Sequence, residues 1–258
     1  MKRVRTVLIA AAMGVTFAFS TSTAGAATAG QEHSPDLQTL QPSEIRITQT
    51  CSLYGLGGCK RILRFSNIAA NLGDGRLEMR PQNSSSSGKT TAFQRVYSHN
   101  SWGAWYFVRE FPVGEFSYHP SHSHWHFEGF ANYSLVTANA SDTVIRGTTK
   151  RSSQKTTFCV IDTTNVNASL VHSEGQRYTD CGPSDWTGLS VGWGDRYGWD
   201  LPGQEMDITG QPNGYYWLVS TVDFQRRLTE TNETNNCAAA KIEIRGTSVY
   251  DRGQKIPC

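Results

Sequence analysis

Histidine is concentrated in one short segment of this chain. Four of the seven histidines lie within residues 119–126, in the sequence HPSHSHWH. Side chains two residues apart point to the same face of an extended strand, so His122, His124 and His126 should share one face. Trp125 should point the other way. Three imidazoles that face one side of a strand predict a metal site.

The donor atoms narrow the choice of metal. Imidazole nitrogens suit copper or zinc better than calcium or magnesium, and the affinity of divalent metals for such sites peaks at copper. We therefore predict copper(II), with zinc as the alternative. On a flat strand, His122 and His126 would lie about 13 Å apart at about 3.3 Å per residue. The strand must bend for all three to reach one ion, or His119 must replace one of them.

Three further segments accompany the histidines. KTTFC occupies residues 155–159 and GLSVGWGDRYGWD residues 188–200, and the last segment comprises residues 205–208 and ETNETNN at 230–236. Together with HPSHSHWHFEGFANYSL at 119–135, these segments resemble the lysyl oxidase family, and the likeness extends over residues 45–258. Members of that family are copper amine oxidases whose redox cofactor is made from the protein's own side chains.

The resemblance implies roles for individual residues. It implies that His122, His124 and His126 bind copper(II), and that Lys155 and Tyr197 form a lysine tyrosylquinone cofactor. It also implies the oxidative deamination of primary amines, such as peptidyl lysine, to aldehydes with release of ammonia and hydrogen peroxide. The expected partners are therefore a primary amine or a lysine-containing protein, and molecular oxygen.

The chemistry of these residue types agrees with such roles. A phenol close to Cu(II) and O2 can be oxidised to an ortho-quinone, which is an electrophile that an unprotonated amine can attack. Burial lowers the pKa of a lysine, and so favours the unprotonated amine of Lys155. The resulting carbonyl cofactor acts as an electron sink. Asp195, two residues before Tyr197, is our candidate for the base that removes the α-proton of the substrate.

Two other functions are compatible with the histidines alone. A secreted copper-binding protein without catalysis would need the three imidazoles but neither Lys155 nor Tyr197. A zinc-dependent hydrolase would keep an open water position on a three-histidine ion, with Glu128 as the base. A quinone absorption band, reaction with phenylhydrazine and peroxide release with a primary amine would distinguish the oxidase from both.

The segments that contain these residues are predicted to be strands. Charged residues make up only 18% of the chain, while glycine, serine, threonine and aromatic residues are abundant, which favours strands joined by turns over long helices. We predict an all-β fold, a single-domain β-sandwich with long loops and few or no helices. The predicted strands are 44–50, 61–67, 75–80, 105–111, 122–135, 155–161, 215–222 and 241–244.

The beginning of the chain has the features of a secretory signal peptide. Three basic residues within the first five precede an apolar run over residues 7–19, and AGA at 24–26 is an A-x-A cleavage pattern. The run is shorter than the roughly 20 apolar residues that a membrane span needs. We predict a signal peptide over 1–26, a flexible lead-in over 27–41 and a catalytic domain over 42–258, in a secreted, extracellular protein.

Charge and cysteines add two further expectations. Of 24 basic residues, removal of the three in the signal peptide leaves 21 against 22 acidic ones, so neither nucleic acid nor an anionic membrane is an expected partner. Six cysteines follow the signal peptide, and export permits disulfides. Sequence proximity favours the pairs Cys51 with Cys59, Cys159 with Cys181, and Cys237 with Cys258. Alternation along 155–161 would place Lys155 and Cys159 on one face.

Overall fold

The computed structural model describes residues 31–51, 58–83, 87–100, 102–121, 123–153, 155–182 and 186–258. The predicted signal peptide and His122 lie outside the described residues. The described part of the chain forms strands and no helices, which confirms the all-β class. Within that part, no helix is long and apolar enough to cross a bilayer.

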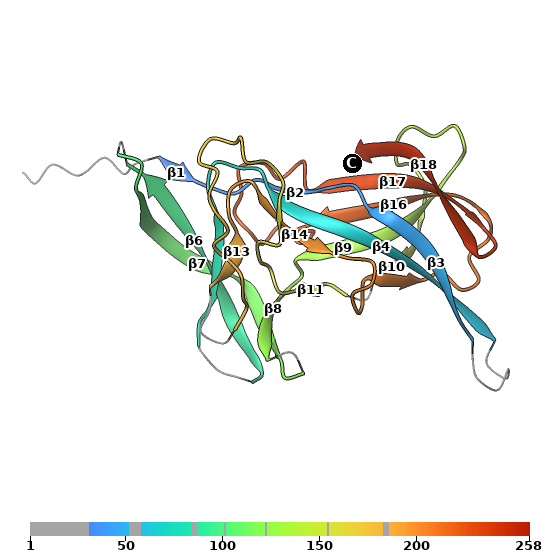
Figure 1. The fold of residues 1–258 in the computed structure, drawn as a ribbon, viewed down its shortest axis with the longest axis horizontal. Helices are drawn as coiled ribbons and strands as arrows, with labels where there is room; N and C mark the ends of the chain where they lie inside the picture. Colours follow the sequence, from blue (N-terminus) through green and yellow to red (C-terminus); the bar gives the residue numbers. More distant parts are fainter. Residues whose placement is uncertain are drawn as a thin grey trace, which may run out of the picture.

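The largest sheet contains the histidine segment. Its antiparallel strands follow the order β11-β8-β7-β6-β5-β13, and β1 also pairs with β6. The strands are β1 (Glu32–His33), β5 (Leu77–Pro81), β6 (Lys89–His99), β7 (Trp105–His119), β8 (His124–Glu128), β11 (Thr157–Phe158) and β13 (Thr187–Leu189). Figure 1 shows the β6 and β7 ribbons at one end of an elongated molecule.

Two further antiparallel sheets make up the rest of the described fold. One has the order β10-β9-β16-β17-β18, and the other the order β12-β14-β4-β15, with β2 and β3 also paired with β4. The strands are β2 (Leu37–Thr39), β3 (Ser43–Cys51), β4 (Cys59–Asn71), β9 (Ala131–Ala138), β10 (Thr149–Ser152), β12 (Thr164–Asn165), β14 (Trp193–Tyr197), β15 (Glu205–Asp207), β16 (Gly214–Val222), β17 (Cys237–Arg245) and β18 (Ser248–Pro257).

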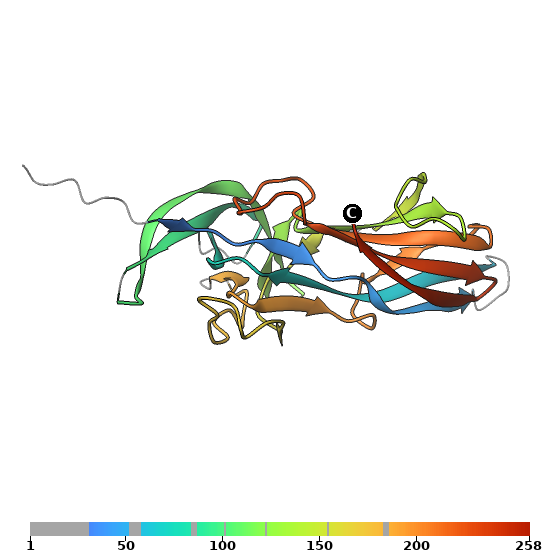
Figure 2. The same ribbon diagram turned by 90° about the horizontal axis from the view of Figure 1, so that it is seen from above.

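These two sheets pack on one another to form a sandwich. In Figure 2 the orange and red strands β16 to β18 lie over the blue and cyan strands β3 and β4. Phe65 of β4 meets Tyr133 of β9 edge to face, with ring centroids 4.9 Å apart. The buried cluster that contains these rings also contains Phe127 of β8. Burial of each such side chain contributes about 1.5–3 kcal/mol, so one core supports all three sheets.

The predicted strands differ from the observed ones in two places that matter for the site. The predicted strand 122–135 is two strands, β8 and β9, because the chain turns at Gly129, whose φ of 78° favours glycine. The predicted strand 155–161 is reduced to β11. Strand β6 was not predicted because polar residues occupy its inward face, where Thr90, Gln94 and Ser98 are buried.

Residues 31–41 belong to the fold, although we expected them to be part of a flexible lead-in. Strand β2 pairs with β4, and Leu37 at its start is fully buried. The Leu37 N–H donates a 2.6 Å hydrogen bond to the carboxylate of Glu230, 193 residues further along the chain. The expectation failed because the segment has few apolar residues and its partners are remote in sequence.

Three disulfides join the cysteines in the predicted pairs. Cys51 is bonded to Cys59, Cys159 to Cys181, and Cys237 to Cys258. The second of these bridges lies beside the candidate site.

Candidate active site

A reversal of the chain between β7 and β8 brings the histidines together. His119 ends β7 and His124 begins β8, and the two residues are partners in the antiparallel register. Ser123 adopts the left-handed backbone conformation, with φ 57°, which helps the chain to reverse. The histidine segment is therefore bent, as a shared ion requires, and His119 lies across from His124.

The three described imidazoles of this segment are in contact. The ring centroids of His119 and His126 lie 4.1 Å apart, and those of His124 and His126 lie 4.9 Å apart. The Nε2 atoms of His124 and His126 are 2.9 Å apart. Ring nitrogens at this distance can share a hydrogen bond, and they are also close enough to bind one ion. The spacing fits two ligands of a single copper ion.

The opposite face of β8 anchors the segment to the core. Trp125 and Phe127 are both almost completely buried, and they lie on the face opposite the imidazoles, where the alternation placed Trp125. The Trp125 N–H donates a 2.8 Å hydrogen bond to the carbonyl of Cys181, and the Phe127 ring packs on Phe116 with centroids 5.6 Å apart. These contacts fix the strand, and so fix the direction in which the imidazoles point.

A pocket of about 380 Å³ lies beside the imidazoles. Lys155 and Tyr197, which the family resemblance singled out, both line it. Thr157 and Cys159 share this lining with Lys155, in agreement with the alternation expected for that segment. The full lining is His119, His124, His126, Lys155, Thr157, Cys159, Tyr197, Leu201 and Pro202.

The Lys155 amine lies over the Tyr197 ring. Its Nζ atom is 4.7 Å from the ring centroid and donates a 3.2 Å hydrogen bond to the carbonyl of Pro202. Gly203 leaves room for the lysine, since a Cβ there would meet Lys155 Cδ at 3.0 Å, and its φ of 78° also favours glycine. Burial lowers the pKa of the Lys155 amine. The negative charge of Asp195 tends to raise this pKa, but the effect of burial is larger. The amine is therefore more readily deprotonated than an exposed lysine.

Tyr197 ends β14, a strand that the sequence analysis did not predict. Its hydroxyl donates a 2.8 Å hydrogen bond to the carbonyl of Cys159, and its ring meets Phe158 edge to face at 4.7 Å. Burial raises the pKa of this phenol well above its usual range, and the charge of Asp195 adds to the effect. The ring is thus held as a neutral phenol in a fixed orientation.

Asp195 is buried next to Tyr197. Asp195 is only 2% exposed, and it is not among the described residues that line the pocket. The Thr163 hydroxyl donates a 3.4 Å hydrogen bond to it. Burial raises the pKa of Asp195 well above the usual value for a carboxyl group. The structure therefore brings Asp195 to the tyrosine but not to the open side of the pocket.

Glu128 is engaged elsewhere. It lies two residues after His126, but it forms a 2.9 Å ion pair with Lys89 and accepts a hydrogen bond from the Ser117 hydroxyl. The Ser117 hydrogen bond, with the Lys89 charge, lowers the pKa of Glu128. A carboxylate in these contacts is a weak base, which disfavours the hydrolase alternative.

Two pocket residues, Leu201 and Pro202, were missed by the sequence analysis. The Pro-Gly pair at 202–203 is a turn signal that could have identified the loop. The sequence offers no indication that this loop folds over Lys155, because the contact joins segments that are distant in the chain.

Residues 98–253 match the family model described as lysyl oxidase, and this match covers more than half of the 258 residues. The chain belongs to the lysyl oxidase family. The matched range includes the histidine segment, Lys155 and Tyr197, so the resemblance inferred from the four motifs is confirmed.

Several curated relatives align with this lysyl oxidase family member. Protein-lysine 6-oxidase of Homo sapiens is 30% identical over 148 residues, which cover 57% of this chain and 32% of that protein. Lysyl oxidase homolog 4 of Homo sapiens is 29% identical over 194 residues, which cover 75% of this chain and 20% of that protein. Lysyl oxidase homolog 2 of Gallus gallus is 24% identical over 215 residues, which cover 83% of this chain and 22% of that protein. The aligned part of this chain spans at most about a third of these relatives.

Proposed function

We propose that this chain is a copper-dependent amine oxidase that converts primary amines, such as peptidyl lysine, to aldehydes. The overall reaction consumes one O2 and one water per amine and releases one ammonia and one hydrogen peroxide. The observation that supports it is the convergence of imidazoles, a lysine amine and a tyrosine ring in one pocket. A passive copper carrier has no use for the lysine and the tyrosine.

The residues present fit the two groups that this activity requires. His124 and His126 offer Nε2 atoms at the spacing of two ligands, and the proposed third ligand is His122. The Thr157 hydroxyl lies 3.5 Å from Nδ1 of His126, a contact that can orient a ligating ring. Lys155 and Tyr197 are in contact and so fit the two precursors of lysine tyrosylquinone, a carbonyl cofactor that accepts the electron pair of the amine.

The surrounding residues position these side chains. The Pro202 carbonyl holds the Lys155 amine over the ring, and the Cys159 carbonyl holds the Tyr197 hydroxyl. The lowered pKa of Lys155 favours the unprotonated amine, which is the form that can attack an oxidised ring. Leu201 and Pro202 supply apolar surface at the pocket, which limits the access of water.

We propose Asp195 as the base for the α-proton. A carboxyl group with a raised pKa is a better proton acceptor once it is ionised than an exposed one. Because its side chain is buried beside Tyr197, this role requires the substrate carbon to approach from the side of that ring. An Asp195→Asn variant that acquires the cofactor and turns over at the parental rate would exclude it.

A second cavity supports an amine that is attached to a larger molecule. It has a volume of about 670 Å³, and Lys155, which also lines the first pocket, forms part of its wall together with Gly203. Its other walls include Lys60, Arg151 and Asp207. A polypeptide that presents its lysine to the first pocket could therefore place neighbouring polar residues in the second.

We also propose that the protein is secreted. The A-x-A pattern at the start of the chain and the three disulfides support export. In this proposal residues 1–26 are the signal peptide, and the catalytic domain includes β1 and β2 in addition to 42–258.

The test is to load the full mature chain with copper in air. We expect a quinone absorption band, reaction with phenylhydrazine, and peroxide release when a primary amine is added. Peptide mass analysis should recover Lys155 and Tyr197 as one cross-linked species. If the chain bound copper but both residues were recovered unmodified, the proposed oxidase activity would be refuted, and a copper-binding protein without catalysis would be the remaining interpretation. Hydrolysis that needs zinc and is lost in Glu128→Gln would favour the hydrolase.

A further inference from the structure

A second group of three histidines lies outside the candidate active site. His33 is on β1, His99 ends β6, and His172 lies in the connection between β12 and β13. The four histidines of residues 119–126 and these three account for all seven in the chain. Three segments that are far apart in sequence thus each contribute one imidazole to one location.

The three rings lie close together, although their nitrogens do not all lie within 4.8 Å of one another, so one ring must rotate before they can share an ion. Their centroids are 4.5 Å apart for His99 and His172, 5.1 Å for His33 and His172, and 6.2 Å for His33 and His99. An ion bound tetrahedrally at about 2.0–2.1 Å by three imidazole nitrogens places the ring centroids about 5 Å apart. The observed distances bracket this value. The widest one requires His33 or His99 to rotate toward the ion.

Asp74 orients two of the rings. Nδ1 of His33 lies 2.9 Å from the Asp74 carboxylate, and Nδ1 of His172 lies 3.2 Å from the Asp74 carbonyl. When these Nδ1–H groups donate, the Nε2 atom of each ring is left as the ligand. Metal-bound histidines usually donate their other ring nitrogen to a carboxylate or a backbone carbonyl in this way.

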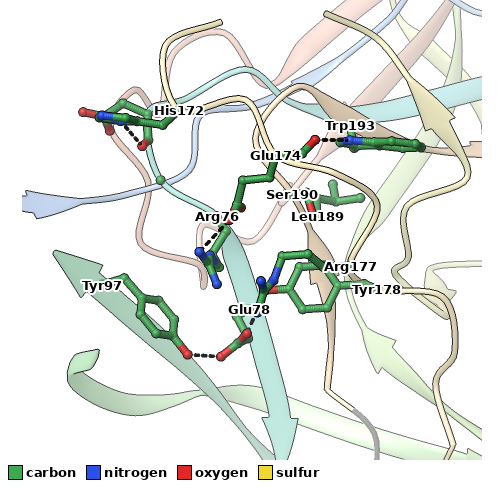
Figure 3. Close-up of polar contacts among 12 residues, drawn as sticks. Arg76, Glu78, Tyr97, His172, Glu174, Arg177, Tyr178, Leu189, Ser190 and Trp193 are labelled. Atoms are coloured by element: carbon green, nitrogen blue, oxygen red, sulfur yellow. Dashed lines mark hydrogen bonds and ion pairs between the residues drawn. The ribbon is translucent and has the colours of Figure 1, made fainter. Parts of the chain in front are cut away.

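The backbone at His172 is held in an uncommon conformation. Its φ is 66°, in the left-handed region, an unfavourable conformation that persists only where the surroundings impose it. Figure 3 shows the residues that hold this loop. Glu174 forms a 2.5 Å ion pair with Arg76, which is only 5% exposed, and the Trp193 indole donates to the Glu174 carbonyl at 2.8 Å. The position of the His172 ring is therefore imposed by a buried network.

Trp105 forms one wall of the group. Its ring lies edge to face with His33, His99 and His172, at centroid distances of 5.4, 5.1 and 5.3 Å. The Arg76 guanidinium also lies 5.0 Å from the Trp105 ring, but its charge is balanced by the ion pair with Glu174. The Asp74 carboxylate contacts His33, and its negative charge favours a bound cation.

We propose that His33, His99 and His172 bind a transition-metal ion, zinc or copper, with Asp74 orienting the rings of His33 and His172. Three imidazole donors suit these two metals. The ion would join β1 to the β6–β7 hairpin and to the loop before β13. This site uses none of the residues of the candidate active site, so it stands or fails independently of the oxidase.

The first test counts metal ions in a chain that lacks the candidate copper site. The full mature chain with His124→Ala and His126→Ala is stripped with a chelator and titrated separately with ZnCl2 and CuSO4. We expect about one equivalent bound by saturable binding, and loss of that equivalent when His33→Ala and His172→Ala are added. The chain with only the latter two substitutions should keep its peroxide release. Absence of saturable binding by the parent of this series would overturn the proposal.

A second test uses Trp105 and does not require the fourfold histidine variant to fold. In the His124→Ala, His126→Ala chain, Cu2+ should quench a fluorescence component that is absent from Trp105→Phe. Asp74→Asn should weaken the binding of either metal by about 10- to 100-fold, whereas Asp251→Asn on β18 should have no effect. Equal affinities in the Asp74 and Asp251 variants, or unchanged quenching in Trp105→Phe, would refute the assignment.

Discussion

Replacement of Tyr197 by phenylalanine separates the chemical role of this residue from its structural role. The change removes one oxygen and keeps the ring that packs on Phe158 at 4.7 Å. The lost interaction is the 2.8 Å hydrogen bond from the hydroxyl to the Cys159 carbonyl. Loss of a buried hydrogen bond of this kind lowers the free energy of unfolding by about 1–2 kcal/mol. For a chain of this size, the melting temperature should fall by roughly 2–8 °C.

The same substitution should abolish the proposed cofactor, because a phenylalanine ring has no phenol to oxidise. Tyr216→Phe is the matched control, since the Tyr216 hydroxyl also donates a 2.8 Å hydrogen bond to a carbonyl, that of Pro212, and the residue is buried. Both variants should show a similar loss of stability by thermal unfolding. Only Tyr197→Phe should lose the reaction with phenylhydrazine and the release of peroxide from a primary amine.

Two outcomes would refute this reasoning. If Tyr197→Phe still reacted with phenylhydrazine and released peroxide at the parental rate, Tyr197 would not be the cofactor precursor. If Tyr216→Phe lost the cofactor as well, the effect would arise from general destabilisation and not from the chemistry at position 197.

Three further predictions concern single side chains. Lys155→Arg should leave copper binding intact but give no phenylhydrazine adduct, because arginine stays protonated and cannot attack an oxidised ring; an adduct in this variant would contradict the role of Lys155. His126→Asn should lose copper from the active site, as measured by metal analysis after dialysis, since its Nε2 lies 2.9 Å from that of His124; retention of a full equivalent would exclude it as a ligand. Burial raises the pKa of Glu230 to about 8, so the folded state holds this proton more tightly than the unfolded chain does. The free energy of unfolding should therefore fall as pH rises from 6 to 8, and Glu230→Gln should flatten that decline in denaturant titrations. Carboxylate oxygens of Asp223, Glu230 and Glu233 lie within 4.8 Å of one another and could bind a metal ion. These titrations therefore need a chelator in the buffer, so that metal binding does not change the titration of Glu230.

Short-range sequence patterns predicted part of the geometry of the site correctly. Alternation predicted that Trp125 points away from His124 and His126, and the structure shows that this face of the five-residue strand is buried in the core. The same repeat placed Lys155 beside Cys159 on the pocket side, although β11 itself is only two residues long. Local periodicity is therefore informative even where regular pairing is brief.

Contacts between remote segments could not be derived from the sequence. Leu37 is buried because its strand pairs with β4 and its backbone binds Glu230. The residues next to Leu37 in the sequence do not indicate either contact. The meeting of His33, His99 and His172 likewise depends on how β1, β6 and a long connection are arranged by the sheet. The buried position of Asp195 follows from the pairing of β14 with β4, and β14 has too little hydrophobic alternation to be recognised.

The bridge between Cys159 and Cys181 bears on the moment at which such an enzyme can mature. The Cys159 carbonyl accepts a hydrogen bond from the hydroxyl of Tyr197. The Cys181 carbonyl accepts one from the backbone N–H of Trp125, which lies between His124 and His126 in the sequence. One covalent bond thus couples the backbone behind the phenol to the backbone behind the metal ligands. In a reducing compartment these two segments would not be covalently coupled, so we expect the proposed cofactor to form only where this disulfide can form.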